Sequence, residues 1–251
     1  MTLVNLLFSE CLKLKRTKIV PLSILGSLGA PILMILEALY THFNEPETLF
    51  TLYDIYDSAL VYMMLLTNVM TYIIILSYVF SREYMENTLK IILPIPVSRT
   101  KFIFSKFILL FFWMLVLSFV TWFSILTLFY IYHFIFGIAD FTFYSALAWL
   151  IKYLFAGMLI FFSITPFAYL AQKSKGFITP LIYGTLSTMV SVALLNRDLS
   201  TLYPFTISFE IIKGNLIGSN YPSLVSIFIL SLTSTLGFIA TLRYFYKEDI
   251  N

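Results

Sequence analysis

The chain has 251 residues, of which 60% are hydrophobic and only 12% are charged, with a formal net charge of +3. A soluble domain carries about 25% charged residues, so this chain has too few charges to cover a surface that faces water. The composition therefore predicts a membrane protein and excludes a soluble enzyme. It also excludes a disordered chain, which needs low hydrophobicity and high charge. A single cysteine excludes an intramolecular disulfide.

The first 18 residues predict an amphipathic helix that lies along the membrane surface. Apolar residues recur at helical spacing from Leu3 to Leu14, and no small-residue cleavage site of a signal peptide follows them. The alternative is a terminal extension that frays from the first span. Cations of this segment can face anionic lipid, and the predicted interfacial set is Lys13, Lys15, Arg16 and Lys18.

Six apolar stretches are each long enough to cross a bilayer, which takes about 20 helical residues. They do not alternate as β-barrel strands do, and backbone groups in lipid must be paired within their own segment. We therefore predict an all-α membrane protein in one domain, 1–251, with an interfacial helix over 1–18, a bundle over 19–243 and a tail over 244–251. The predicted spans are 19–40, 58–80, 103–131, 146–171, 177–196 and 221–243. The third stretch is too long to stand upright, so it tilts or ends in the outer interface.

The positive charges predict the topology. Thirteen of the 16 lysines and arginines fall on one side of these spans, and only Lys152, Arg197 and Lys213 fall on the other. The cation-rich side is cytoplasmic, which places both termini inside. The outer segment 197–221, between the fifth and sixth spans, is long and half apolar, and prolines and glycines interrupt it. It predicts a pair of short helices that re-enter the outer leaflet.

The inner loop between the second and third spans carries the most information. Residues 84–93 are compatible with a helix, which Pro94 and Pro96 then end. Ser98 is well placed to cap the helix that follows. Such a loop presents a rigid knob to a cytoplasmic partner. The alternative is a charged connector that only reverses the chain.

Arg82-Glu83 before Thr88-Leu89, followed by Pro96-Val97-Ser98-Arg99 and Lys106, resembles the signature of type-2 ABC exporter permeases. The resemblance covers the whole chain, although the family usually has Gly where this chain has Asn87. It implies that 84–93 is the coupling helix, which docks into a groove of a separate ATP-binding subunit. The ATPase-coupling residues that it implies are Glu83, Tyr84, Glu86, Thr88, Leu89, Lys90 and Arg99. A short chain without a large outer domain further resembles the permeases that confer bacitracin or lantibiotic resistance.

The resemblance implies a function in a bacterial cell membrane. The chain would be the membrane-spanning subunit of an ATP-driven exporter that moves or removes a membrane-active peptide antibiotic or another amphipathic substrate. Its expected partners are an ABC ATP-binding subunit, a second permease copy or a paralogous permease, and the lipid bilayer, with no nucleic acid. No Gly-Lys dipeptide, and so no phosphate-binding loop of that type, occurs in the chain. We therefore expect no catalytic residue or cofactor on this chain, with ATP and Mg on the partner.

The alternative function is a membrane-embedded enzyme or a non-transporting membrane interaction protein. The two histidines, His42 and His133, lie on different outer loops and form no zinc-protease motif. Within the spans, Asn68 and Thr67 are the faint candidates for an enzyme site, and Asn more often bonds a neighbouring helix. No acidic or histidine relay is visible at mid-membrane, which argues against a proton-coupled transporter.

Overall fold

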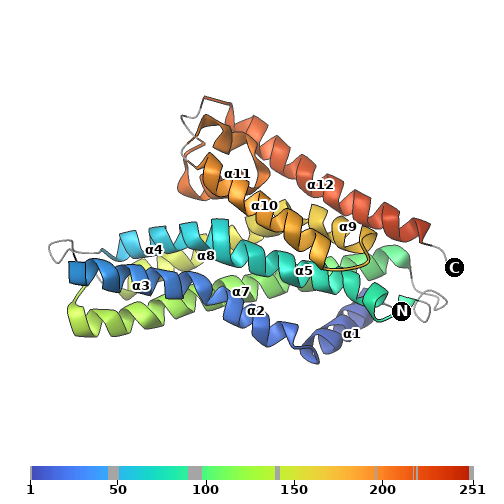
Figure 1. The fold of residues 1–251 in the computed structure, drawn as a ribbon, viewed down its shortest axis with the longest axis horizontal. Coiled ribbons are helices and arrows are strands. Elements are labelled where there is room, and N and C mark those ends of the chain that lie inside the picture. The colour runs from blue at the N-terminus through green and yellow to red at the C-terminus, as the bar shows by residue number, and fades with distance from the viewer. Residues whose placement is uncertain are drawn as a thin grey trace.

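The computed structural model describes residues 2–44, 51–89, 98–138, 142–195, 197–216, 218 and 220–248, and within these ranges it contains helices and no β-strand. The all-α prediction is confirmed for them. The elements labelled in Figure 1, together with the short helices η1 and η2, follow one another along the chain. They are α1 (Leu3–Lys15), α2 (Ile19–Ser27), α3 (Gly29–Asn44), α4 (Leu52–Tyr62), η1 (Met63–Thr67), α5 (Asn68–Met85), α7 (Arg99–Phe136), α8 (Phe143–Ile164), α9 (Pro166–Lys173), α10 (Ile178–Leu194), η2 (Asp198–Leu202), α11 (Pro204–Lys213) and α12 (Ser223–Lys247).

Five helical stretches of the described chain are long and apolar enough to cross a membrane. They are Ile19–Asn44, Leu52–Met85, Arg99–Phe136, Phe143–Ile164 and Ser223–Lys247. The predicted fifth span corresponds to α10, which is apolar but has only 17 residues. The structure thus supports a multi-pass membrane protein with five candidate spans and one shorter apolar helix.

The predicted third span is one continuous helix. α7 has 38 residues, which at the rise of an α-helix make a rod of about 57 Å. A bilayer core is about 30 Å thick, so α7 must tilt or project beyond it. The helix ends at Gly137, whose φ of 78° favours glycine because a Cβ atom would be strained there.

The first candidate span is interrupted between α2 and α3. Pro31 has no N–H group, so it cannot donate to the carbonyl oxygen of Ser27 four residues earlier. The Thr121 hydroxyl of α7 lies 3.0 Å from that oxygen and can donate to it. A free carbonyl in lipid would be costly, and α7 therefore supplies the partner that the proline removes.

Small residues let α2 and the start of α3 lie close to the second candidate span. A Cβ atom added to Gly26 would lie 2.4 Å from the Thr71 hydroxyl oxygen, and one added to Gly29 would lie 2.9 Å from a Thr67 methyl carbon. Glycines at such positions allow helix backbones to approach in membranes. The close packing fixes the second candidate span against the first.

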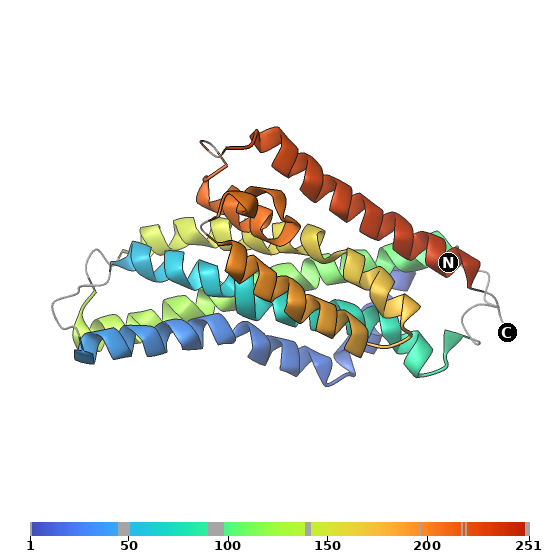
Figure 2. The ribbon, with the colours of Figure 1, turned by 45° about the horizontal axis from the view of Figure 1, so that its top comes forward.

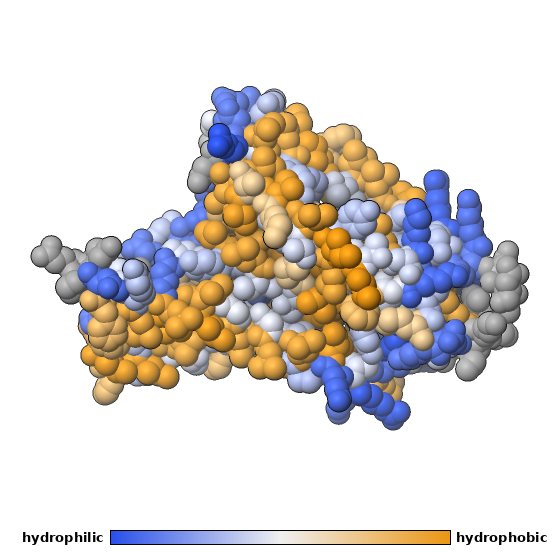
Figure 3. Space-filling model, viewed as in Figure 1, coloured by the Kyte–Doolittle hydropathy of each residue, from blue (hydrophilic) through white to orange (hydrophobic). Residues whose placement is uncertain are grey.

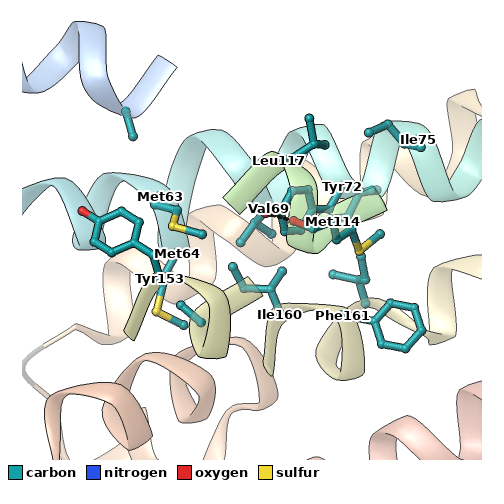
Figure 4. Packing of buried hydrophobic residues seen from close by; sticks show 14 of the residues in the cluster. Met63, Met64, Val69, Tyr72, Ile75, Met114, Leu117, Tyr153, Ile160 and Phe161 are labelled. Carbon is teal, nitrogen blue, oxygen red and sulfur yellow. Dashed lines mark hydrogen bonds between the residues drawn. The ribbon is translucent and has the colours of Figure 1, made fainter. Parts of the chain in front are cut away.

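The apolar core lies where η1 and α5 meet α7 and α8 (Figure 4). η1 is one turn of π-helix in which the Asn68 N–H donates to the carbonyl oxygen of Met63, five residues back. The labelled core side chains come from these four elements and are Met63, Met64, Val69, Tyr72, Ile75, Met114, Leu117, Tyr153, Ile160 and Phe161. The first three residues of the π-turn, Met63–Leu65, are therefore buried in the packed centre of the bundle.

The segment that joins α10 to α12 packs on the bundle. In Figures 1 and 2, α11 lies between α10 and α12. The Ser208 hydroxyl of α11 is 2.7 Å from the Ser163 hydroxyl of α8, and Thr206 donates to the carbonyl oxygen of Ser200 at 2.5 Å. Ser163 lies about 30 Å along α8 from Phe143, given the rise of an α-helix. The N-terminal half of α11 thus contacts the C-terminal end of α8.

The start of α1 and the end of α12 lie at the same end of the molecule, which we call the terminal end (Figures 1 and 2). Figure 3 shows hydrophilic residues gathered there, and apolar residues over much of the rest of this face.

Candidate functional site

The candidate site lies at the terminal end, where α5 leaves the bundle. The structure corrects the predicted start of the short helix, because Tyr84 and Met85 belong to α5. The backbone then breaks at Asn87, whose φ is 55°. The N–H of Asn87 donates to Tyr84 O and that of Thr88 to Glu83 O, which is the hydrogen-bond pattern of a Schellman cap.

Asn87 explains how the chain turns without the family's usual glycine. A C-cap in the left-handed region is most often Gly and sometimes Asn, since Asn tolerates this conformation better than other side chains. Of the predicted helix, residues 90–97, including Lys90, Pro94 and Pro96, lie outside the described residues.

The turn offers a small polar surface. Glu86 and Asn87 are exposed, and Thr88 and Leu89 are half-buried. Beside them is a pocket of about 480 Å³ between α1 and the turn. Its lining is Lys13, Arg16, Thr17, Arg82, Glu83, Glu86 and Thr88. Of the predicted coupling residues that the structure describes, Glu86, Thr88 and Leu89 lie on this turn.

Glu83, which the resemblance places among the coupling residues, points inward and belongs to a buried ion cluster instead of an exposed surface. Glu83 Oε2 accepts from Lys106 Nζ of α7 at 2.5 Å, and its Oε1 lies 3.4 Å from Arg82 and 3.9 Å from Lys13. Glu10 of α1 faces the same three cations at 2.6 Å for Lys13, 3.4 Å for Arg82 and 3.9 Å for Lys106. We call these five residues the ionic joint.

Four members of the ionic joint are almost completely buried. Glu10 is 2% exposed, Arg82 5%, Glu83 3% and Lys106 1%. The Lys106 ammonium also donates to the carbonyl oxygen of Val79 at 2.6 Å, and it lies 5.1 Å from the centre of the Phe102 ring. A charge buried in this way is tolerated only when it is paired and hydrogen-bonded. Each carboxylate has that compensation.

Electrostatics of the ionic joint favour the ionised form of Glu10. Burial by itself raises the pKa of this carboxyl, but the charges of Lys106, Lys13 and Arg82 together outweigh burial and hold the pKa below its ordinary value. Sequence reasoning missed Glu10, although a signal was present. Glu10 lies four residues from both Leu6 and Leu14, the other two buried residues of α1, so a charge stood on the apolar face.

Arg99 and Tyr84 join the loop to the end of α12. The Arg99 guanidinium donates to the carbonyl oxygens of Phe245, Tyr246 and Glu248 at 3.2, 2.7 and 3.0 Å. The last carbonyls of a helix have no partner within it, and a cation there also suits the helix dipole. The Tyr84 hydroxyl lies 3.5 Å from the Glu248 carboxylate. The predicted coupling residue Arg99 thus caps α12.

The predicted interfacial cations separate into two groups. Lys13 belongs to the ionic joint, while Lys15, Arg16 and Lys18 are exposed. The predicted helix over the first 18 residues is observed as α1, which ends at Lys15. The terminal-extension alternative is not supported, because α1 packs on α7.

Polar side chains inside the bundle bond to one another. Asn68 donates to the Thr121 hydroxyl of α7 at 2.8 Å, which confirms the expectation that it bonds a neighbouring helix. The Tyr72 hydroxyl lies 2.7 Å from that of Ser118. Glu37 accepts from the Tyr62 hydroxyl at 2.8 Å. Among the described residues no group of three or more His, Cys, Asp or Glu side chains could hold a metal ion.

Comparison with known proteins identifies the class. The sequence model described as "ABC-2 family transporter protein" matches residues 6–191, which is most of the chain, so this protein belongs to the ABC-2 family of transporters. The chain is also 34% identical over 203 residues to the "Bacitracin transport permease protein BCRB" of Bacillus licheniformis. That alignment covers 79% of this chain and 93% of the relative.

Proposed function

We propose that this chain is the membrane-spanning permease subunit of an ATP-driven exporter that moves or removes a membrane-active peptide antibiotic of the bacitracin type. The observation that carries the proposal is the likeness to a bacitracin permease over nearly the whole of that relative. Hydrolysis of ATP, with its Mg, takes place on a separate ABC ATP-binding subunit. The chain works as one permease domain over 1–251.

In the proposed topology, the terminal end faces the cytoplasm of a bacterial cell and the membrane is crossed six times. α10 is the fifth crossing, since its 17 residues span about 26 Å. An even number of crossings is supported by the position of the start of α1 and the end of α12 at one end (Figure 1). The hydrogen bonds of α11 to the distant part of α8 support a re-entrant segment over η2 and α11.

The ATP-binding subunit docks at the turn that follows α5. Glu86, Thr88 and Leu89, with Lys90 beyond them, make the contact, and Glu83, Tyr84 and Arg99 hold the two sides of the loop to the bundle. A second permease copy or a paralogous permease completes the transporter, and the exposed apolar side chains of α3 and α10 offer surface to it and to lipid.

The test is to express the chain in a bacitracin-sensitive bacterium, alone and with its ATP-binding subunit. We expect a higher inhibitory concentration of bacitracin only when both subunits are present, and none when the ATPase cannot hydrolyse ATP. Copurification of the ATPase with the tagged permease checks the assembly. An unchanged sensitivity to bacitracin with both subunits in the membrane would contradict the proposed substrate.

The docking surface has a separate test. Thr88→Pro should weaken copurification of the ATPase, because proline removes the N–H that closes the cap on α5. Thr127→Pro, inside α7, is the control and should damage folding instead. Normal assembly and resistance with Thr88→Pro would show that the loop is only a connector.

A further inference from the structure

The ionic joint connects helices that would not need to be connected for the docking of an ATP-binding subunit at the turn after α5 by itself. Its members come from three elements that are far apart in the chain, namely α1, the last turns of α5 and the second turn of α7. α1 packs on α7 and reaches the end of α5 through Glu10 and Lys13, which face Arg82 and Glu83. The same few ion pairs thus connect the surface helix to both sides of the coupling loop.

Lys106 is the centre of this connection. Its ammonium bonds Glu83 and the Val79 carbonyl, both on α5, and lies 3.9 Å from the Glu10 carboxylate on α1. An apolar contact can slide, because hydrophobic attraction has no direction. Buried ion pairs are different, since a displacement of one partner leaves the other as an uncompensated charge. The three elements therefore have to move together.

We propose that the ionic joint makes α1, the end of α5 and the start of α7 one rigid body, so that the ATPase displaces the interfacial helix together with the coupling loop. Glu10 and Lys106 act in this as positioning residues. The inference rests on the proposed function, because it assumes that an ATP-binding subunit pushes on the turn at 86–89. Its consequence is that ATP hydrolysis moves an amphipathic helix at the membrane surface, and not only the spans.

A spin label on α1 can detect this movement. Phe8 lies on α1 and is 64% exposed, so the label is placed with Phe8→Cys in a Cys11→Ser background. The purified complex of permease and ATPase is reconstituted in liposomes, and the label is compared without nucleotide and after trapping with ATP and vanadate. In the parent we expect the spectrum of the label to change on trapping. We also expect bacitracin to stimulate ATP hydrolysis by the parent complex.

Lys106→Met and Glu10→Gln should both abolish the nucleotide-dependent change of the label and reduce bacitracin-stimulated hydrolysis on the order of tenfold, the size of a typical coupling between sites. Copurification of the ATPase and its basal hydrolysis should remain, since neither residue lies on the docking surface. Glu10→Asp, which keeps the charge, should recover part of the response. Lys175→Met is the matched control, because Lys175 pairs with Glu248 at 3.5 Å but is 62% exposed.

Two results would overturn the inference. One is a full change of the label in Glu10→Gln or Lys106→Met, with bacitracin-stimulated hydrolysis reduced by less than about fivefold, the small end of such couplings. The other is the same loss in Lys175→Met. If the Lys106→Met variant cannot be recovered from membranes, the label change and the stimulated hydrolysis of Glu10→Gln test the inference by themselves.

Failure of the proposed function would look different. In that case no ATPase copurifies with the parent chain. The rigid body can still be examined in the permease alone, where Glu10→Gln should make the label on α1 more mobile than in the parent. Equal mobility would contradict the joint itself.

Discussion

The terminal end and the α11 region are held in place by different forces. At the terminal end, buried carboxylates and cations connect α1, α5 and α7, and Arg99 connects α7 to α12. In the α11 region, contacts to α8 run through hydroxyl groups such as Ser163 and Ser208, and the ion pair of Lys213 with Asp57 of α4 is partly exposed. Removing one partner of a buried ion pair costs about 3–5 kcal/mol, whereas a hydrogen bond between membrane helices contributes about 0.6 kcal/mol.

The difference teaches where this protein can move. Elements tied by buried ion pairs resist displacement relative to one another, whereas hydroxyl bonds and a partly exposed ion pair such as Lys213 with Asp57 are weaker ties. We therefore expect the helices at the terminal end to be held together more firmly than those of the α11 region. Four substitutions test this contrast, from the largest expected effect to the smallest.

Lys106→Met should have the largest effect on stability. It leaves two buried carboxylates with one cation fewer, and the expected loss is about 3–5 kcal/mol in the free energy of unfolding. The measurement is thermal unfolding of the detergent-purified permease. Lys175→Met, at the exposed pair with Glu248, should change stability by about 0–1 kcal/mol. If Lys106→Met and Lys175→Met lower the free energy of unfolding equally, the buried ion pairs do not hold the terminal end more firmly than an exposed pair would.

Gly237→Ala tests the packing of α12 between the two regions. An added Cβ atom would lie 2.6 Å from the backbone nitrogen of Pro166 and 2.7 Å from the carbonyl carbon of Thr165. Backbone atoms cannot change rotamer as a side chain can, so α12 must shift. We expect the free energy of unfolding to fall by about 1–3 kcal/mol. Gly176→Ala, where the nearest atom is 3.7 Å away, is the control. If both variants melt like the parent, α12 is loosely packed at this point.

Substitutions of Asn87 test the left-handed turn that ends α5. Asn87→Val should destabilise the turn by about 1–2 kcal/mol, because the left-handed conformation brings a β-branched side chain into conflict with the backbone. Asn87→Gly should keep or raise the stability, since glycine adopts this conformation freely. Proteolysis at the loop and the melting temperature measure the effect. A stable Asn87→Val variant would show that the turn has another conformation.

Ser163→Ala should have the smallest effect. It removes the hydroxyl that bonds Ser208 and the Pro204 carbonyl oxygen, and the expected loss is about 0.6 kcal/mol. Thermal unfolding of Ser163→Ala beside the parent measures it. A loss as large as that of Lys106→Met would show that the α11 region is as firmly fixed as the terminal end.

Much of the architecture could be predicted from the sequence. Charge-free apolar stretches, the amphipathic start and the prolines are local features, and they placed five candidate spans and α1 close to their observed bounds. The motif from Arg82 to Lys106 predicted the family, which the match over residues 6–191 confirms. The sequence did not predict that α5 continues through Tyr84. The helix ends at a residue in the left-handed conformation, and the sequence has Asn87 there instead of the glycine that usually marks such an end.

The sequence by itself determined that this protein is helical and apolar enough for a membrane, since these properties follow from composition and neighbouring residues, and its motif from Arg82 to Lys106 resembles that of ABC-2 permeases. Only the tertiary structure decided what the charges do. Glu10 and Arg82 are 72 positions apart and meet as a buried pair, and Arg99 finds its partners almost 150 positions away, at the end of α12. A local pattern gives the face of a helix on which a charge lies. The partner on the facing helix depends on how the bundle packs, because a buried charge is stable only where distant elements bring the opposite charge to it.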